Sequence, residues 1–179
     1  LISAPLESVL SSSEALSDEA LTNLNVMQSN SNRLLTLVNQ LLDFSKIENR
    51  SIRISLANQN IYQILHAVYN RFKPSAENNS IGLEYKYDNN NFEAIVDSEN
   101  ITKITSNLLT NALKHTKNLI ILELDSNYAD NFFKISVSDN GPGIEEKETE
   151  DIFKPFYQIS GQNKTGTGIG LYLVKSITE

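Results

Sequence analysis

The chain has 179 residues, of which 40% are hydrophobic and 21% are charged, enough for one domain with a core and a helical extension. There are 15 lysines and arginines against 22 aspartates and glutamates, and the net charge of −7 argues against a nucleic-acid binder. The absence of cysteine excludes disulfides, thiolate metal sites and a cysteine nucleophile. No run of about 18 apolar residues is present, so no membrane span is predicted. The N-terminus, without methionine or a basic stretch, indicates a piece of a longer protein.

Residues 1–48 have the pattern of two helices. Pro5 suits a first helical turn, and polar residues from Ser17 supply an N-cap for a second helix that runs to residue 48. The second helix carries a heptad seam at steps of three and four: Leu21, Leu24, Gln28, Ser31, Leu35, Val38 and Leu42. Such a seam predicts a helical hairpin that pairs with a second copy. The other interpretation is a helix that packs on its own domain.

The second part of the chain, residues 50–179, predicts an α+β domain with helices on one face of a mixed sheet. Period-two alternation predicts strands at 51–57, 81–87, 92–96, 119–128 and 132–139. Helical spacing predicts helices at 60–72, 97–114 and 169–178. We expect Pro74 and the asparagines after it to end the first of these helices. The composition changes near Asn49, which predicts the boundary between domains 1–48 and 50–179.

The turn residues Asp88 to Asn91 predict a hairpin between the strands at 81–87 and 92–96. Residues 140–168 carry most of the glycine and have no apolar period, so we expect a long polar loop there.

Three segments of the second domain contain residues that could bind a ligand. The first lies on the helix expected at 97–114, where one polar face holds Asn107, Asn111, Lys114 and His115. An amide carbonyl with waters suits a magnesium ion that also holds phosphate oxygens, and a lysine one turn away can meet the phosphates. Taken alone, such a stripe is more often merely solvated.

The second segment places a carboxylate at a strand end before glycines that let a flat ligand approach the backbone: Asp139, Gly141, Gly143 and Ile144. A simple turn is an equally good interpretation. The third segment opens into the last helix, where backbone N–H groups and the helix dipole make an anion cradle: Gly166, Thr167, Gly168, Gly170 and Leu171. It lacks the preceding strand of a dinucleotide fold and the lysine of a P-loop, and a flexible linker is the alternative.

In this order the three segments resemble the asparagine box and the two glycine boxes of the sensor histidine kinases, relatives of gyrase B, Hsp90 and MutL. Phe153 and Phe156, in Phe-Lys-Pro-Phe-Tyr, resemble the phenylalanine box of the same kinases, and residues 41–48 resemble the end of their second dimerisation helix. The C-terminal pattern is similar to hybrid sensor kinases of Bacteroidetes. The resemblance implies that residues 1–48 form half of a dimeric four-helix bundle and that residues 50–179 form a Bergerat-type ATP-binding fold.

The resemblance also implies ligand roles. Asn111 would ligate Mg²⁺, Asn107 would support phosphate or metal, and Lys114 would bind phosphate. His115 would lie near the ribose and phosphates, and Asp139 would accept the adenine amine. The other box residues would frame the base (Gly141, Gly143, Ile144), cover the phosphates (Gly166, Thr167, Gly168, Gly170, Leu171) and anchor the lid (Phe153, Phe156).

The family's phosphoacceptor histidine would stand five residues before Pro5, just ahead of Leu1. The chain is therefore expected to hold no catalytic residue and, by itself, not to autophosphorylate. Of its two histidines, His66 is interpreted as structural and His115 belongs to the ATP site. The resemblance implies further strands after Glu179, so both ends are expected to be truncated.

The implied reaction is phosphoryl transfer from ATP to a histidine, and then to the aspartate of a response regulator. Gyrase-like hydrolases place a glutamate base where this chain has Asn107, and an amide takes no proton, which favours transfer over hydrolysis. The implied setting is a homodimer in the cytoplasmic portion of a membrane-anchored bacterial sensor, attached to the membrane only through parts outside this chain. The alternative is a non-catalytic, nucleotide-binding dimeric module that regulates a partner.

Overall fold

The computed structural model describes residues 17–49, 54–129, 132–159 and 166–179. The chain divides into two compact units, Leu1–Ser51 and Ile52–Glu179, and each is described by itself. The helix expected near Pro5 lies outside the described residues.

The first unit contains helix α2, Asp18–Glu48, with 31 residues. At 1.5 Å per residue it is about 46 Å long. The Ser17 hydroxyl accepts a hydrogen bond from the Ala20 N–H at 3.2 Å, which confirms the predicted N-cap. Its seam leucines are largely exposed within the chain, at 57% for Leu35 and 54% for Leu42. Among the described helices, none has both the length and the apolar character that crossing a bilayer requires.

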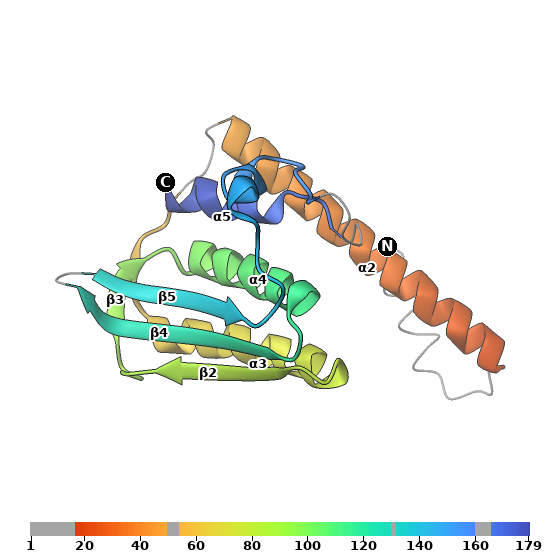
Figure 1. Ribbon diagram of the computed structural model, residues 1–179, viewed down its shortest axis with the longest axis horizontal. Helices are drawn as coiled ribbons and strands as arrows, with labels where there is room; N and C mark the ends of the chain where they lie inside the picture. The colour runs from red at the N-terminus through yellow and green to blue at the C-terminus, as the bar shows by residue number, and fades with distance from the viewer. Residues whose placement is uncertain (1–16, 50–53, 130–131, 160–165) are drawn as a thin grey trace. The chain divides into compact units, whose positions relative to one another are not determined.

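The second unit has two sheets (Figure 1). The three-stranded sheet is mixed: β4 (Leu119–Ala129) pairs in parallel with β2 (Gly82–Tyr87) and antiparallel with β5 (Phe132–Asp139). A separate antiparallel pair joins β1 (Ala57–Asn60) to β3 (Glu93–Val96).

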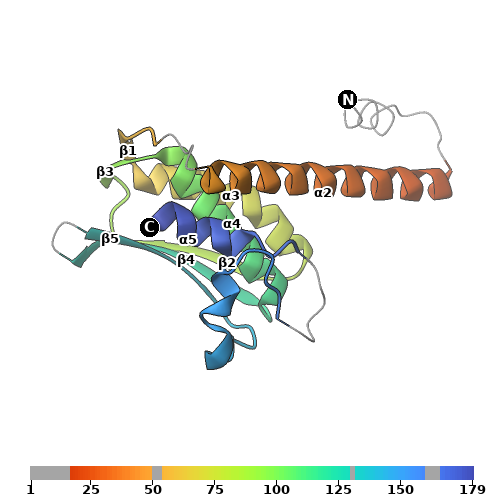
Figure 2. The ribbon, with the colours of Figure 1, turned by 90° about the horizontal axis from the view of Figure 1, so that it is seen from above.

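Three helices lie on one side of the three-stranded sheet, as seen in Figure 2. They are α3 (Ile61–Asn78), α4 (Ser98–His115) and α5 (Gly170–Thr178), and α5 packs on α4. Two short 3₁₀ turns, η1 (Glu146–Glu148) and η2 (Asp151–Phe153), precede α5. This arrangement confirms the predicted α+β class.

The core lies between these helices and the inner face of β4. Alternate residues of β4 are completely or almost completely buried: Ile120, Leu122 and Leu124. Leu65 of α3 packs in the same cluster as Leu122, and Leu109 of α4 in the same cluster as Ile120. Burial of each such side chain contributes roughly 1.5–3 kcal/mol, so β4 is the element on which both helices depend.

The strand predicted at 51–57 is displaced toward the C-terminus. Strand β1 covers only Ala57–Asn60, and residues 51–53 lie outside the described part. Ile54 and Leu56 alternate with polar residues but are 66% and 64% exposed. Their alternation therefore does not mark a buried face of a strand in this unit. The Ser55 N–H donates to the Asp97 carboxylate at 2.8 Å, so at that position a side chain serves as the acceptor.

The predicted hairpin between 81–87 and 92–96 is wrong. The two segments belong to different sheets, because β2 pairs with β4 and β3 pairs with β1. The Asp88 carboxylate accepts hydrogen bonds from the backbone N–H and the hydroxyl of Ser126, which attaches the end of β2 to β4. The Ile61 N–H donates to the Phe92 carbonyl at 2.9 Å, which extends the pairing of β1 with β3 by one residue.

The prediction that helix α3 stops near residue 72 is also wrong. The helix continues through Pro74 to Asn78, and Asn79 is the C-cap. Pro74 has no N–H for the usual helical bond, but Ala76 is fully buried beyond it. The Ile81 N–H donates to the Ala76 carbonyl at 2.9 Å, so packing and capping hold the last turn.

Candidate nucleotide-binding site

Helix α4 has a capped N-terminus and a buried apolar face, and its polar residues lie on another side. The Asp97 carboxylate caps the first turn by accepting from the Asn100 N–H at 3.0 Å. Leu109 and Ala112 are buried, so Asn107 and Asn111 lie half-buried on another side of the helix. Their spacing therefore places a row of amides along α4, with Lys114 exposed at its end.

The glycine-rich segment that enters α5 lies against this polar face. A Cβ added at Gly170 would be 3.0 Å from Asn107 Oδ1, and one added at Gly166 would be 3.3 Å from Lys114 Nζ. Asn107 Nδ2 donates to the Lys103 carbonyl at 2.9 Å. With its Nδ2 held on its own helix, Asn107 directs its amide oxygen at the first residue of α5.

The first turn of α5 is available for an anion. Its N-cap residue, Ile169, makes no side-chain capping hydrogen bond, and the N-terminus of a helix carries partial positive charge. The Thr167 hydroxyl accepts from the Ile169 N–H at 3.3 Å, which orders the approach to the helix. An ammonium group, an amide oxygen and a helix N-terminus thus converge from segments about 50 residues apart.

The loop after β5 is packed against the end of α4. The Gly141 N–H donates to Asp139 Oδ1 at 2.8 Å. A Cβ at Gly141 would lie 2.4 Å from the His115 carbonyl oxygen, so only glycine fits there. Gly143 has a φ of +75°, which favours glycine for conformational reasons, and Ile144 is 48% exposed.

The phenylalanine box meets the second glycine box through the backbone. The Phe156 N–H donates to the Gly168 carbonyl at 2.9 Å, and a Cβ at Gly168 would lie 2.5 Å from the Phe156 carbonyl carbon. Both residues have left-handed φ angles, +63° for Phe156 and +71° for Gly168. Phe153 lies near α5, with its ring centroid 5.9 Å from Lys175 Nζ. Backbone contacts therefore hold the phenylalanine box and the second glycine box together.

A tyrosine next to the phenylalanine box ties that box to η1. The Tyr157 hydroxyl donates to the Glu148 carboxylate, and this hydrogen bond is the main reason why the pKa of Tyr157 is raised to about 12. The tyrosine stays protonated at physiological pH and keeps donating to Glu148.

Asn140 is a site residue to which the sequence analysis gave no role. It stands between Asp139 and Gly141, and its side chain is bonded to Thr116, Asn118 and Leu119 in the turn after α4. Its place inside the first glycine box was visible in the sequence. Its partners were not, because they lie more than 20 residues earlier in the chain.

The structure brings together Asn107 with Gly170, Lys114 with Gly166, His115 with Gly141, and Phe156 with Gly168. Asn111 lies on α4 between Asn107 and Lys114. Leu171 is half-buried in the first turn of α5. The nucleotide roles of all these residues remain predictions.

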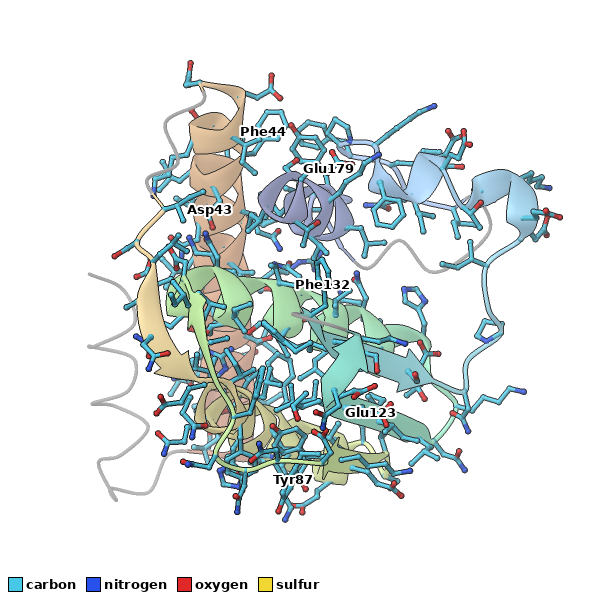
Figure 3. The ribbon with its side chains drawn as sticks, turned by 90° about the vertical axis from the view of Figure 1, so that its left-hand side faces the viewer. Asp43, Phe44, Tyr87, Glu123, Phe132 and Glu179 are labelled. Atoms are coloured by element: carbon cyan, nitrogen blue, oxygen red, sulfur yellow. The ribbon has the colours of Figure 1, made fainter. Side chains whose placement is uncertain are left out.

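His66 belongs to a different region. It is an exposed residue of α3, and its ring stacks on Tyr62 with the centroids 5.4 Å apart. The same tyrosine meets Tyr87 of β2 at 4.6 Å, and Figure 3 shows Tyr87 beside α3. His66 therefore lies in an aromatic cluster of α3 and β2.

The donor set in this region fits magnesium nucleotide better than a protein-only metal centre. In the part of the chain that the structure describes, no three histidine, cysteine or acidic side chains gather to hold a metal. Neutral amide oxygens beside an anion cradle suit Mg²⁺, which keeps waters and shares phosphate oxygens with its ligand. The Asn107 oxygen and the neighbouring Asn111 supply such groups.

Two family models match the chain. Residues 2–50 match the His Kinase A (phospho-acceptor) domain, and residues 96–179 match the histidine kinase-, DNA gyrase B- and HSP90-like ATPase. The sensor histidine kinase TmoS of Ectopseudomonas mendocina is 32% identical over 184 residues, which is 100% of this chain and 19% of TmoS. The chain spans 13–24% of the length of curated relatives of this kind.

Solved structures agree with these matches. Full-length ShkA in complex with AMPPNP is 26% identical, with a TM-score of 0.77 over 98% of this chain and 38% of ShkA. The complex of histidine kinase ThkA with the response regulator protein TrrA gives a TM-score of 0.62 over 88% of this chain and 46% of ThkA. At 22% identity, that second likeness shows the fold alone. The matches to both domains identify the chain as a member of the sensor histidine kinase family, with a phosphoacceptor-type dimerisation region followed by an ATP-binding domain.

Proposed function

We propose that this chain is the dimerising and Mg-ATP-binding core of a two-component sensor kinase, which supplies the γ-phosphoryl group to a histidine and thereby to a response regulator. The observation that carries the proposal is the approach of Asn107 and Lys114 to Gly170 and Gly166. It gathers polar and cationic groups at an uncapped helix N-terminus, which is the chemistry that a polyphosphate needs.

On the base side, Asp139 is the proposed acceptor for the exocyclic amine of adenine. Its Oδ1 is held by the Gly141 N–H, and the glycine lets the loop pack closely against the His115 carbonyl. Guanine presents a carbonyl where adenine presents an amine, so a carboxylate at this point would face another acceptor.

On the phosphate side, Lys114 is proposed to neutralise phosphate charge, and the first turn of α5 to donate N–H groups. Asn111 is the proposed magnesium ligand and Asn107 its neighbour. When bound, the metal would draw charge from the phosphate oxygens, and the chain's own groups position the nucleotide for transfer.

In histidine phosphorylation, a neutral imidazole nitrogen attacks the γ-phosphorus, the bond to the β–γ bridging oxygen breaks, and ADP leaves. The first histidine of this sequence is His66, in the aromatic cluster of α3. His115 ends α4, where in-line attack on a nucleotide held by the same helix is geometrically poor. We therefore propose that this chain alone binds ATP without phosphorylating itself, and that hydrolysis stays near background because Asn107 cannot act as a base.

The proposed partners are a second copy of the chain and a receiver domain. The phosphoacceptor family match and the exposed seam of α2 support the dimer. Membership of the sensor histidine kinase family supports a response-regulator partner, and ThkA is one histidine kinase that was solved with such a protein.

Calorimetry with Asp139→Asn tests the proposed ATP site. We expect wild-type protein with Mg²⁺ to bind ATP more tightly than GTP by about 2–3 kcal/mol, since one contact is satisfied and the other repelled, and Asp139→Asn to lose most of this preference. Asp125→Asn is the matched control, because Asp125 lies on the same sheet but pairs with Lys134, well along the strands from Asp139. Equal affinity for ATP and GTP in the wild type would refute the role of Asp139.

The proposed inactivity is tested with γ-labelled ATP and Mg²⁺. We expect no acid-labile, alkali-stable label on the chain. Stoichiometric label of that kind would contradict the proposal, and its loss in His115→Ala or His66→Ala would show which histidine reacts.

A further inference from the structure

Four hydrogen bonds fasten the Asn140 side chain to the turn that follows helix α4. Its Oδ1 accepts from the Thr116 hydroxyl at 2.9 Å and from the backbone N–H groups of Asn118 and Leu119, both at 3.1 Å. Its Nδ2 donates to Asn118 Oδ1 at 2.6 Å. One amide therefore uses both of its polar atoms on a segment more than 20 residues away in sequence.

This attachment joins the two ends of the candidate site. Thr116 is the C-cap of α4, and its N–H donates to the Ala112 carbonyl at 2.8 Å, so the turn continues the helix that carries Asn107 and Lys114. Asn140 itself lies directly between Asp139 and Gly141. The Asn140 side chain thus connects the base loop to the phosphate side of the site, in addition to the backbone hydrogen bond from the Asn140 N–H to the Leu119 carbonyl at 3.3 Å.

The contact of Gly141 with the His115 carbonyl cannot replace this connection. That contact keeps the loop from moving closer to α4, because a Cβ would already lie 2.4 Å from the carbonyl oxygen. It supplies no attraction that keeps the loop from moving away. The β4–β5 pairing ends at Ile120 and Asp139, and beyond that point the side-chain hydrogen bonds of Asn140 strengthen the restraint on the loop.

We propose that Asn140 is a positioning residue for ATP, which sets the separation between Asp139 and the phosphate-binding residues of α4. The inference rests on the proposed function of the site. A ligand that contacts both ends, such as ATP, gains only when the two ends are correctly spaced. Adenosine contacts the base loop alone and has no such requirement.

The contribution of Asn140 to folding is expected to be smaller than its effect on ATP. Asn140 and Asn118 are both exposed, so water can satisfy the freed groups when the amide is removed. What water does not restore is the fixed geometry of the loop. The two roles are therefore separable by experiment.

The test compares Asn140→Leu with wild type by measuring dissociation constants for ATP and for adenosine. ATP affinity is read by calorimetry with Mg²⁺, and adenosine affinity by NMR titration of the Gly141 and Gly143 amides, which reaches the millimolar range. We expect Asn140→Leu to weaken ATP about tenfold, the equivalent of one or two lost hydrogen bonds, and adenosine by about twofold or less. Asn140→Asp keeps an acceptor for the three donors and is expected to restore most of the ATP affinity.

Asn60→Leu is the matched control. Asn60 caps α3 by accepting from the Gln63 N–H at 2.9 Å, and its Nδ2 donates to the Asn90 carbonyl. This variant loses two side-chain hydrogen bonds away from the candidate site, so it should lower Tm without changing ATP affinity. Equal losses for ATP and adenosine in Asn140→Leu, or no loss, would overturn the inference. If the proposed function itself fails, wild-type protein will not bind ATP, which is a different result.

Discussion

Helices α2 and α4 are both amphipathic, and they differ in where the apolar face goes. In α4 the apolar face closes the core of its own unit, with Leu109 fully buried and Ala112 nearly so. In α2 the seam residues Leu35, Val38 and Leu42 are 45–57% exposed within the chain. The comparison indicates that α4 is stabilised by its own unit, whereas the apolar face of α2 would be covered by the second copy in the proposed dimer. Substitutions in α4 should therefore change folding, and substitutions in α2 should change association.

The largest effect is expected for the seam of α2. Leu35→Glu places a charge on the face that would be buried, and a homodimer contains the change twice, so association should weaken by roughly 3–6 kcal/mol. Sedimentation equilibrium measures the change as a dissociation constant at least about a hundredfold higher. Ser29→Glu, on a different side of the helix, is the control and should leave the dimer intact. A wild-type chain that stays monomeric at high micromolar concentration would remove the basis for the comparison.

The next effect belongs to the core face of α4. Leu109→Ala leaves a cavity between α4 and Ile120 of β4 and should lower the free energy of unfolding by about 2–5 kcal/mol. Urea denaturation at fixed protein concentration measures this loss. Sedimentation of the same variant, below its unfolding transition, should show an unchanged dimer. A weaker dimer would mean that the two helices are not independent.

A smaller effect is expected where α4 begins. Asp97→Ala removes the N-cap and the bond to Ser55, and should lower the free energy of unfolding by about 0.5–2 kcal/mol. The Ser55 N–H, followed by that of Asn100, lowers the pKa of Asp97 below its usual value. A lowered folded-state pKa adds stability above the unfolded pKa of about 3.9, and this stability is lost as pH falls through the folded value. Acid titrations of wild type and Asp97→Ala should therefore converge at low pH, and parallel curves would contradict the assignment.

The smallest expected effect is a gain, rather than a loss, in the free energy of unfolding. The Thr105 hydroxyl on α4 is buried without a hydrogen-bond partner among the described residues. Thr105→Val keeps the shape and removes the unpaired group, so stability should stay level or rise by about 1 kcal/mol. Thr110→Val is the control: the Thr110 hydroxyl donates to the Ser106 carbonyl at 2.7 Å, and its removal should be neutral or destabilising. A clear loss in Thr105→Val would show that its hydroxyl has a partner.

Local signals predicted where α2 and α4 begin. The start of α2 was given by Ser17 and that of α4 by Asp97 or Ser98, and the capping partners of Ser17 and Asp97 lie three residues away. The pairing of the strands was not predictable in this way. Asp88 has the composition of a turn, and only its bonds to Ser126, 38 residues later, show that β2 is attached to β4 rather than folded back on β3.

The same division holds for the candidate site. The boxes were recognised from short motifs, and the structure places Asn107 near Gly170, Lys114 near Gly166 and the His115 carbonyl near Gly141. Asn140 was passed over because its role depends on the distant Thr116 and Leu119. Residues that contact a ligand leave a motif in the sequence, whereas a residue that fixes the distance between motifs need not.

The parallel pairing of β2 with β4 also orders the steps of folding. Gly82 pairs with Leu119, 37 residues away, and the intervening chain includes β3 and the whole of α4. By contrast, β4 and β5 form an antiparallel pair joined by a short connection. Closing the longer loop costs more chain entropy, so the β4–β5 hairpin and α4 should form early and β2 should join afterwards. Until it does, the helix-facing residues of β4 lack part of their cover, and the nascent sheet has an open edge at which other chains can add.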